Sequence, residues 1–199
     1  GSSAMTEIAL PLPGYRNNQP VRIGNEAAQQ IQHDAYGQIL LALYNLYTDA
    51  RLGGRHRLSE KALYTLLSYI ERTIDIPDNG VWEFRGKKAI HSYSLLFHWA
   101  GSAACRKIAL GLGDTALADR AEACQKRAAE LLEKCFSRKK NGYAQAIGSD
   151  ELDASLLQMI TLGFFHDKPK EKALAHLRAI QNDLEITPGF LLRYRHDDD

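Results

Sequence analysis

The sequence lacks a long apolar run, a strong net charge and a set of cysteines that could pair. No apolar run approaches the roughly 20 residues of a membrane helix, and no charged leader followed by an apolar segment opens the chain. The 25 Lys and Arg residues nearly balance 24 Asp and Glu residues. Because no strong overall field favours nucleic acid or an anionic membrane, we expect neither as a partner.

Cysteine is scarce, and its placement argues against disulfides and zinc. Cys105, Cys124 and Cys135 cannot all pair within one chain, and they lack the close Cys/His spacing of a zinc site. This usage favours a reducing compartment, and we predict a cytoplasmic location. Cys124 and Cys135 fall on one apolar stripe, where we expect small core residues.

Histidine gives no sign of a metal centre either. No two of the candidates share a helix face with a carboxylate, so hydrogen-bonded helix residues are favoured over metal ligands; the candidates are His33, His91 and His98. We expect no metal and no cofactor.

What the sequence does contain is helical periodicity. Its 199 residues are 45% hydrophobic, enough for one domain with a sizeable core. Pro11, Pro13 and Pro20 predict an extended loop over residues 1–23, with regular structure beginning after it. Apolar residues then recur every three to four positions and predict six main helices, at about 25–50, 59–76, 92–110, 115–137, 150–163 and 169–184.

The helices alternate in character. Those at 59–76, 115–137 and 169–184 have a single apolar stripe, whereas the other three have a polar first turn or are apolar on most sides. Helical hairpins stacked side by side produce this pattern. The fold class we predict is all-α, an α/α toroid in which inner helices are walled by outer ones. A closed toroid needs about twice as many helices, so we expect 1–199 to be a single segment of a larger domain.

One short segment combines three kinds of side chain that a sugar site needs. Trp82, Glu83 and Arg85 lie on a loop before the helix predicted at 92–110. An aromatic face stacks on a sugar ring, a guanidinium donates to hydroxyls, and a carboxyl can protonate a departing oxygen. Taken alone, the trio also fits a packed ring beside a surface ion pair.

Several separate blocks carry a wider resemblance. They are Gly14-Tyr15-Arg16 with Pro20-Val21-Arg22-Ile23-Gly24-Asn25; Gln30, Gln32, Asp34, Tyr36 and Gly37; Gly80 to Arg85; Leu152-Asp153-Ala154-Ser155-Leu156-Leu157; and Arg193-Tyr194 with Asp197. In this order, and over nearly the whole chain, the sequence resembles glycoside hydrolase family 15, which contains glucoamylases, glucodextranases and trehalases, in its bacterial form.

The resemblance implies the later part of an (α/α)6 barrel and inverting hydrolysis of an α-linked glucan or glucoside, glucoamylase-like, with release of glucose. It implies that Glu83 is the general acid, and that Arg193 binds sugar hydroxyls near the scissile bond. Trp82 is expected to stack on sugar and Arg85 to donate to it. Weaker candidates for the site wall are Asn25, Gln30 and Asp34, and Asn25 is also a good cap for a helix starting there.

In the family, the general base follows the block that matches Arg193-Tyr194. We therefore expect the base and the rest of the barrel to come from the remainder of a parent chain, and the 199 residues alone to be inactive. Two alternatives remain open at this point. One is a non-catalytic α/α module that regulates or binds carbohydrate, and the other is a helical scaffold that binds protein on its concave face.

Overall fold

A computed structural model describes residues 7–25, 29–52, 59–83 and 87–195 of the chain. These residues form two compact units, which divide between Ile31 and Gln32.

The first unit contains a short β-hairpin. Strand β1 (Ile8–Leu10) pairs antiparallel with β2 (Val21–Ile23), and a 3-10 turn, η1 (Tyr15–Asn17), lies between them. Gly14 has a φ of 66°, and a Cβ there would lie 2.1 Å from a backbone oxygen, so the connection needs glycine. The sequence predicted no regular structure before residue 24. The difference arises because two three-residue strands are too short to give a periodic signal.

The second unit is helical. Its α-helices are α1 (Asp34–Thr48), α2 (Glu60–Thr73), α3 (Ser92–Leu112), α4 (Thr115–Glu133), α5 (Gln158–Thr161) and α6 (Lys170–Leu184). Two 3-10 helices, η3 (Ala50–Leu52) and η4 (Ala154–Leu157), and two small antiparallel pairs complete it, β3 (Phe136–Ser137) with β4 (Gly142–Tyr143) and β5 (Glu185–Thr187) with β6 (Phe190–Leu191).

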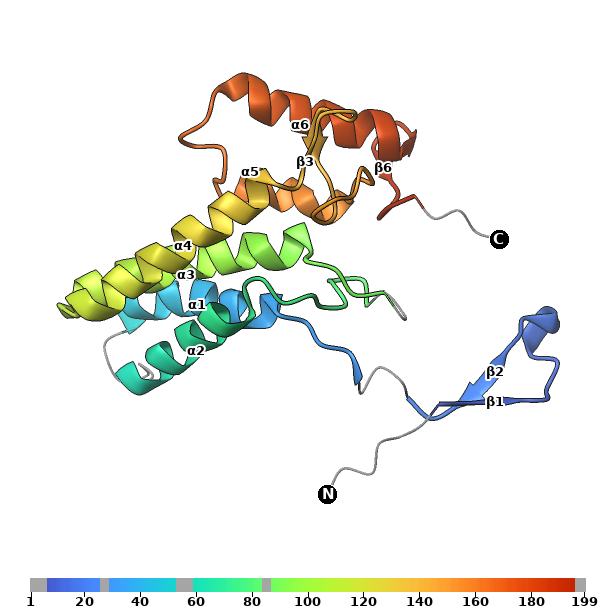
Figure 1. Cartoon of the computed structure of the whole chain (residues 1–199), viewed down its shortest axis with the longest axis horizontal. Coiled ribbons are helices and arrows are strands. Elements are labelled where there is room, and N and C mark those ends of the chain that lie inside the picture. The colour runs from blue at the N-terminus through green and yellow to red at the C-terminus, as the bar shows by residue number, and fades with distance from the viewer. Residues whose placement is uncertain (1–6, 26–28, 53–58, 84–86, 196–199) are drawn as a thin grey trace. The chain divides into compact units, whose positions relative to one another are not determined.

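Successive helices in this unit form hairpins (Figure 1). Helix α3 packs along both α1 and α4, while α2 contacts α1, α3 and α4. Helices α1 and α3 therefore lie next to each other in one layer, with α2 and α4 in the next. The prediction of part of an (α/α)6 barrel is confirmed.

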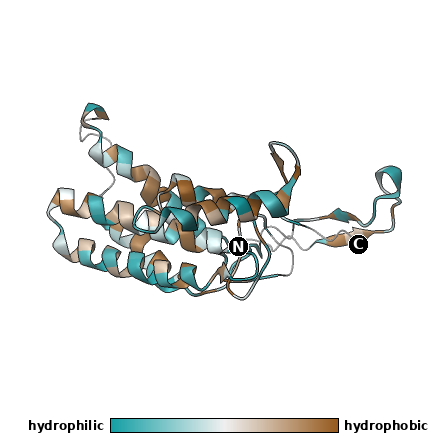
Figure 2. Cartoon of the chain, turned by 90° about the horizontal axis from the view of Figure 1, so that it is seen from above, coloured by the Kyte–Doolittle hydropathy of each residue, from teal (hydrophilic) through white to brown (hydrophobic). Residues whose placement is uncertain are grey.

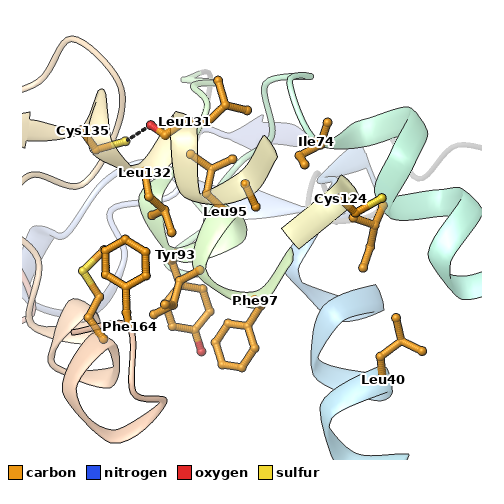
Figure 3. Packing of buried hydrophobic residues seen from close by; sticks show 14 of the residues in the cluster. Leu40, Ile74, Tyr93, Leu95, Phe97, Cys124, Leu131, Leu132, Cys135 and Phe164 are labelled. Carbon is orange, nitrogen blue, oxygen red and sulfur yellow. Dashed lines mark hydrogen bonds between the residues drawn. The ribbon is translucent and has the colours of Figure 1, made fainter. Parts of the chain in front are cut away.

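The core follows the predicted patterns. Helix α3 is buried on most sides, whereas α2 and α4 carry hydrophilic and hydrophobic residues on different sides (Figure 2). Cys124 and Cys135 are buried free thiols in the hydrophobic cluster, Cys135 beside Leu131 (Figure 3), and Cys105 is buried and free as well. The prediction of core cysteines is confirmed.

A glycine pair brings α1 and α3 together. A Cβ added to Gly37 would lie 2.0 Å from the carbonyl oxygen of Phe97, and one added to Gly101 would lie 2.5 Å from the Cα of Gly37. The two backbones touch here, so neither position can hold a larger residue without separating the helices.

Three predicted helix bounds were wrong. Helix α1 begins at Asp34, so Asn25 does not cap it. The residue before the helix, His33, is bound to another segment, because its backbone N–H donates to the Asp78 carboxylate. Helix α4 ends at Glu133, where the next residues pair with residues 142–144. The helix predicted at 150–163 is only η4 followed by α5, and it closes at Gly163, which has a φ of 80°.

Candidate active site

The loop that carries the predicted acid is anchored by one buried carboxylate. Asp78 accepts hydrogen bonds from the backbone N–H of His33 (2.8 Å), the hydroxyl of Ser94 (2.7 Å) and the backbone N–H of Gly80 (3.1 Å). These donors come from the start of α1, from α3 and from the loop itself. Asp78 therefore ties residues 78–83, here called the acid loop, to the two packed helices.

Two further contacts fix the acid loop at Gly80. Its carbonyl oxygen accepts from the side-chain amide of Gln32 at 3.2 Å. Its φ is 68°, and an added Cβ would meet the ring of His91 at 2.9 Å. Only glycine fits this turn, since the backbone is left-handed and the ring leaves no space.

Trp82 is held at its edge by a distant residue. Its indole Nε1–H donates to Asp153 Oδ2 at 2.9 Å, although the two lie 71 positions apart. Asp153 Oδ1 accepts from the backbone N–H of Ser155 at 2.7 Å, which caps η4. Burial raises the pKa of the Asp153 carboxyl above its ordinary value, and the hydrogen bonds from Ser155 and Trp82 oppose that rise.

Arg193 lies over the face of the same indole. Its guanidinium carbon is 5.2 Å from the Trp82 ring centroid and 5.6 Å from that of Tyr194. The two rings lie 6.2 Å apart at 50°. The segment is held by a hydrogen bond from the backbone N–H of Ala154 to the Arg193 carbonyl, at 2.8 Å. Stacking uses the face of a guanidinium and leaves its N–H donors at the edge, where they can meet hydroxyls.

Glu83 follows Trp82 at the exposed end of the acid loop. Its backbone N–H donates to the Gly80 carbonyl at 3.1 Å, which closes the turn, and its φ is 56°. A left-handed backbone is uncommon for a residue with a Cβ and is often found at functional sites. The residue is exposed, and it directly follows Trp82 in the sequence. Arg85 lies outside the described residues.

The weaker candidates separate into two groups. Asp34 is buried at the first position of α1, and its carboxylate accepts from the Gln38 amide. Burial raises the pKa of this carboxyl. It lies directly after His33, so it shares the anchoring region of the acid loop. Asn25 and Gln30 belong to the first unit, and their part in a site stays a prediction.

No role was predicted from the sequence for two residues that contact Trp82, namely Asp153 and Tyr194. Asp153 and Tyr194 belong to motif blocks, yet an Asp two residues before a Ser also fits an ordinary helix cap. A signal for Asp78 was equally weak, because Asp-Asn-Gly is typical of a turn. Their contacts join segments far apart in sequence, which local patterns do not encode.

The described part of the chain gives no sign of a metal centre, since no group of three or more His, Cys, Asp or Glu residues lies close enough together there. Among the same residues, no helix is long and apolar enough to cross a membrane.

Helical hairpins in layers define a protein of the α/α-toroid class. In this protein the Arg193 guanidinium lies over the indole of Trp82, the residue before Glu83. A family model for glycosyl hydrolases family 15 matches residues 1–199. The chain belongs to this family, as its sequence motifs predicted.

Three curated relatives that match this chain are named trehalases. The trehalase of Thermoplasma volcanium is 33% identical over 99% of this chain and 31% of its own length. The trehalase of Thermoplasma acidophilum is 31% identical over 99% of the chain and 34% of its own length, and that of Mycobacterium tuberculosis is 31% identical over 100% and 29%. The chain spans about a third of the length of these relatives.

Proposed function

We propose that this chain supplies the general acid of an inverting α-glucoside hydrolase. The observation that carries the proposal is the contact between Arg193 and Trp82, because it brings hydroxyl donors and a stacking ring to the residue that precedes the carboxyl of Glu83 in the chain. Family membership supports the reaction class. Glu83 protonates the glycosidic oxygen as its bond to C1 breaks, and the oxygen of a water molecule bonds to C1 from the opposite face.

The water must lose a proton to a second carboxylate, roughly 6.5–9.5 Å from the first in inverting enzymes. Asp153 is a poor candidate, since both of its oxygens already accept hydrogen bonds. We assign the base to a part of the protein outside these 199 residues, together with the rest of the barrel. This agrees with a chain that spans about a third of its relatives. The chain by itself is then expected to be inactive.

For the substrate, we propose trehalose in preference to a glucoamylase-type glucan. Three relatives at 31–33% identity are named trehalases, and each matches nearly all of this chain. Trehalose joins two glucose units through both anomeric carbons in the α configuration. A site that accepts it holds two glucose rings, one on each side of the carboxyl.

We also propose a cytoplasmic location. All three thiols are free and buried, and burial raises the pKa of Cys105 to about 12 and the pKa of Cys124 and Cys135 to about 11. Such thiols are core residues and need no oxidising compartment.

The test is an assay of the complete protein that contains this chain, with trehalose, maltose, isomaltose and dextran as substrates. NMR of the first products separates the mechanisms, because inversion of trehalose gives one β-glucose and one α-glucose, whereas retention gives two α-glucose molecules. Glucose release from trehalose in the inverted pattern supports the proposal. Release from none of the four substrates contradicts it.

A further inference from the structure

The indole of Trp82 is restrained from two directions. Asp153 holds its N–H edge at 2.9 Å, and the Arg193 guanidinium lies over one of its faces. Trp82 itself is only half-buried. A ring that is fixed at one edge and contacted over one face can offer a ligand only the part that remains exposed.

The residue that holds the edge is itself firmly placed. Asp153 is 4% exposed, and its second oxygen caps η4 through the backbone N–H of Ser155. Its backbone pairs with that of Tyr194, next to Arg193. Two paired segments thus set the edge contact and the face contact of the indole together.

We propose that Asp153 is a positioning residue, which fixes the plane of the Trp82 indole so that the face opposite Arg193 receives a glucose ring beside Glu83. The proposal rests on the proposed function for its ligand. The orientation of the indole can be measured without any sugar.

A second aspartate of the chain provides a matched control. Asp114 caps α4 through the N–H of Leu117, at 2.9 Å, and accepts from the hydroxyl of Tyr64 at 2.9 Å. It therefore combines a cap with an aromatic donor, as Asp153 does, but in another part of the unit. Asp114→Ala reports what the loss of such a structural role does by itself.

The first experiment observes the indole N–H by NMR in the complete protein labelled with ¹⁵N-tryptophan. The signal that disappears in Trp82→Phe is that of Trp82. We expect Asp153→Ala to shift this signal and to raise its exchange with water about tenfold, because a hydrogen bond to a charged acceptor is lost. Asp114→Ala should leave it unchanged.

Asp153→Asn is the second variant, in case Asp153→Ala does not fold. It keeps the volume of the side chain but has one oxygen in place of two, so the cap and the indole cannot both keep an acceptor. We expect a displaced Trp82 indole signal, because the single carboxamide oxygen cannot serve both donors. An unchanged Trp82 signal in every folded Asp153 variant would overturn the proposal.

The second experiment measures hydrolysis of trehalose by the complete protein. Asp153→Asn is expected to lower kcat/KM about tenfold or more, whereas Asp114→Ala, even with a comparable loss of stability, should leave it near the wild-type value. An active wild-type protein whose kcat/KM is unaffected by Asp153 variants overturns the positioning role alone. A wild-type protein without activity contradicts the proposed function, and the NMR result still decides the orientation of the indole.

Discussion

The imidazole Nε2 of His98 lies 3.0 Å from the backbone carbonyl oxygen of His33. A carbonyl only accepts, so this nitrogen carries the proton of a neutral ring. His98 is 1% exposed. Burial lowers its pKa from 6.5 to about 4, which means that the folded protein resists adding a second proton.

Stability should therefore fall in mild acid. Between pH 6.5 and about 4 the unfolded chain binds a proton at His98 that the folded chain does not, so the free energy of unfolding is at its full value above pH 6.5 and drops across this window. The loss is about 3 kcal/mol for this group. Urea unfolding at pH 7.5 and at about pH 4, the lower end of this window, measures it.

His98→Gln should make that pH dependence shallower, because the amide can still donate to the His33 carbonyl and does not titrate. His166→Gln is the control, since His166 is exposed. Equal slopes for wild type and His98→Gln would show that His98 does not control acid stability. His176 is also buried with a lowered pKa, so in wild type and in His98→Gln alike it makes the free energy of unfolding fall in acid.

Replacing Glu83 tests the acid directly. Glu83→Gln in the complete protein should lower kcat for trehalose by about 10²- to 10⁴-fold, because the amide cannot give a proton to the departing oxygen. α-Glucosyl fluoride needs no such proton, so its hydrolysis should be far less affected. Glu130→Gln, an exposed change on α4, is the control. Equal losses on both substrates would argue for a structural role of Glu83.

Removing the guanidinium over the indole should weaken substrate binding. Arg193→Ala deletes charged donors to sugar hydroxyls and the contact with Trp82, and we expect kcat/KM to fall about 10- to 100-fold. Arg193→Lys should recover little, because an ammonium has no planar face to stack. Arg178→Ala, on an exposed position of α6, should behave as wild type. Full activity of Arg193→Lys would show that charge alone is needed.

Gly80→Ala should damage both fold and activity. The left-handed backbone and the 2.9 Å approach to the His91 ring together cost about 2 kcal/mol or more. Gly111→Ala is the matched control, since no atom lies within 4 Å of an added Cβ in α3, and it should stabilise by about 0.5–1 kcal/mol. Thermal unfolding compares the two. A stable Gly80→Ala protein would mean that the acid loop can rearrange.

The helices with a single apolar stripe could be predicted from sequence, and α2, α4 and α6 begin within one residue of the expected positions. Their bounds depend on local propensity and burial, which a periodic pattern reports. The start of α1 could not be predicted, because the bond from His33 to Asp78 joins residues 45 positions apart.

The candidate site divides in the same way. Trp82, Glu83 and Arg193 were recognisable from residue type and motif. The edge contact of Asp153 and the anchoring role of Asp78 were not, since each depends on which distant donors the fold brings to a buried carboxylate. Residue types and motifs identify the side chains that can act on a sugar. Hydrogen bonds between distant segments determine how those side chains are oriented.

The backbone contact between Gly37 and Gly101 sets the axial register of α1 against α3. Side chains can exchange rotamers as two helices slide, but two bare backbones in contact have no such adjustment. The first residues of α1 and the turn bonded to them are consequently kept at one height along the helix axes. An alanine at either glycine should therefore displace the acid loop, and with it Glu83, the predicted acid, although neither glycine belongs to that loop.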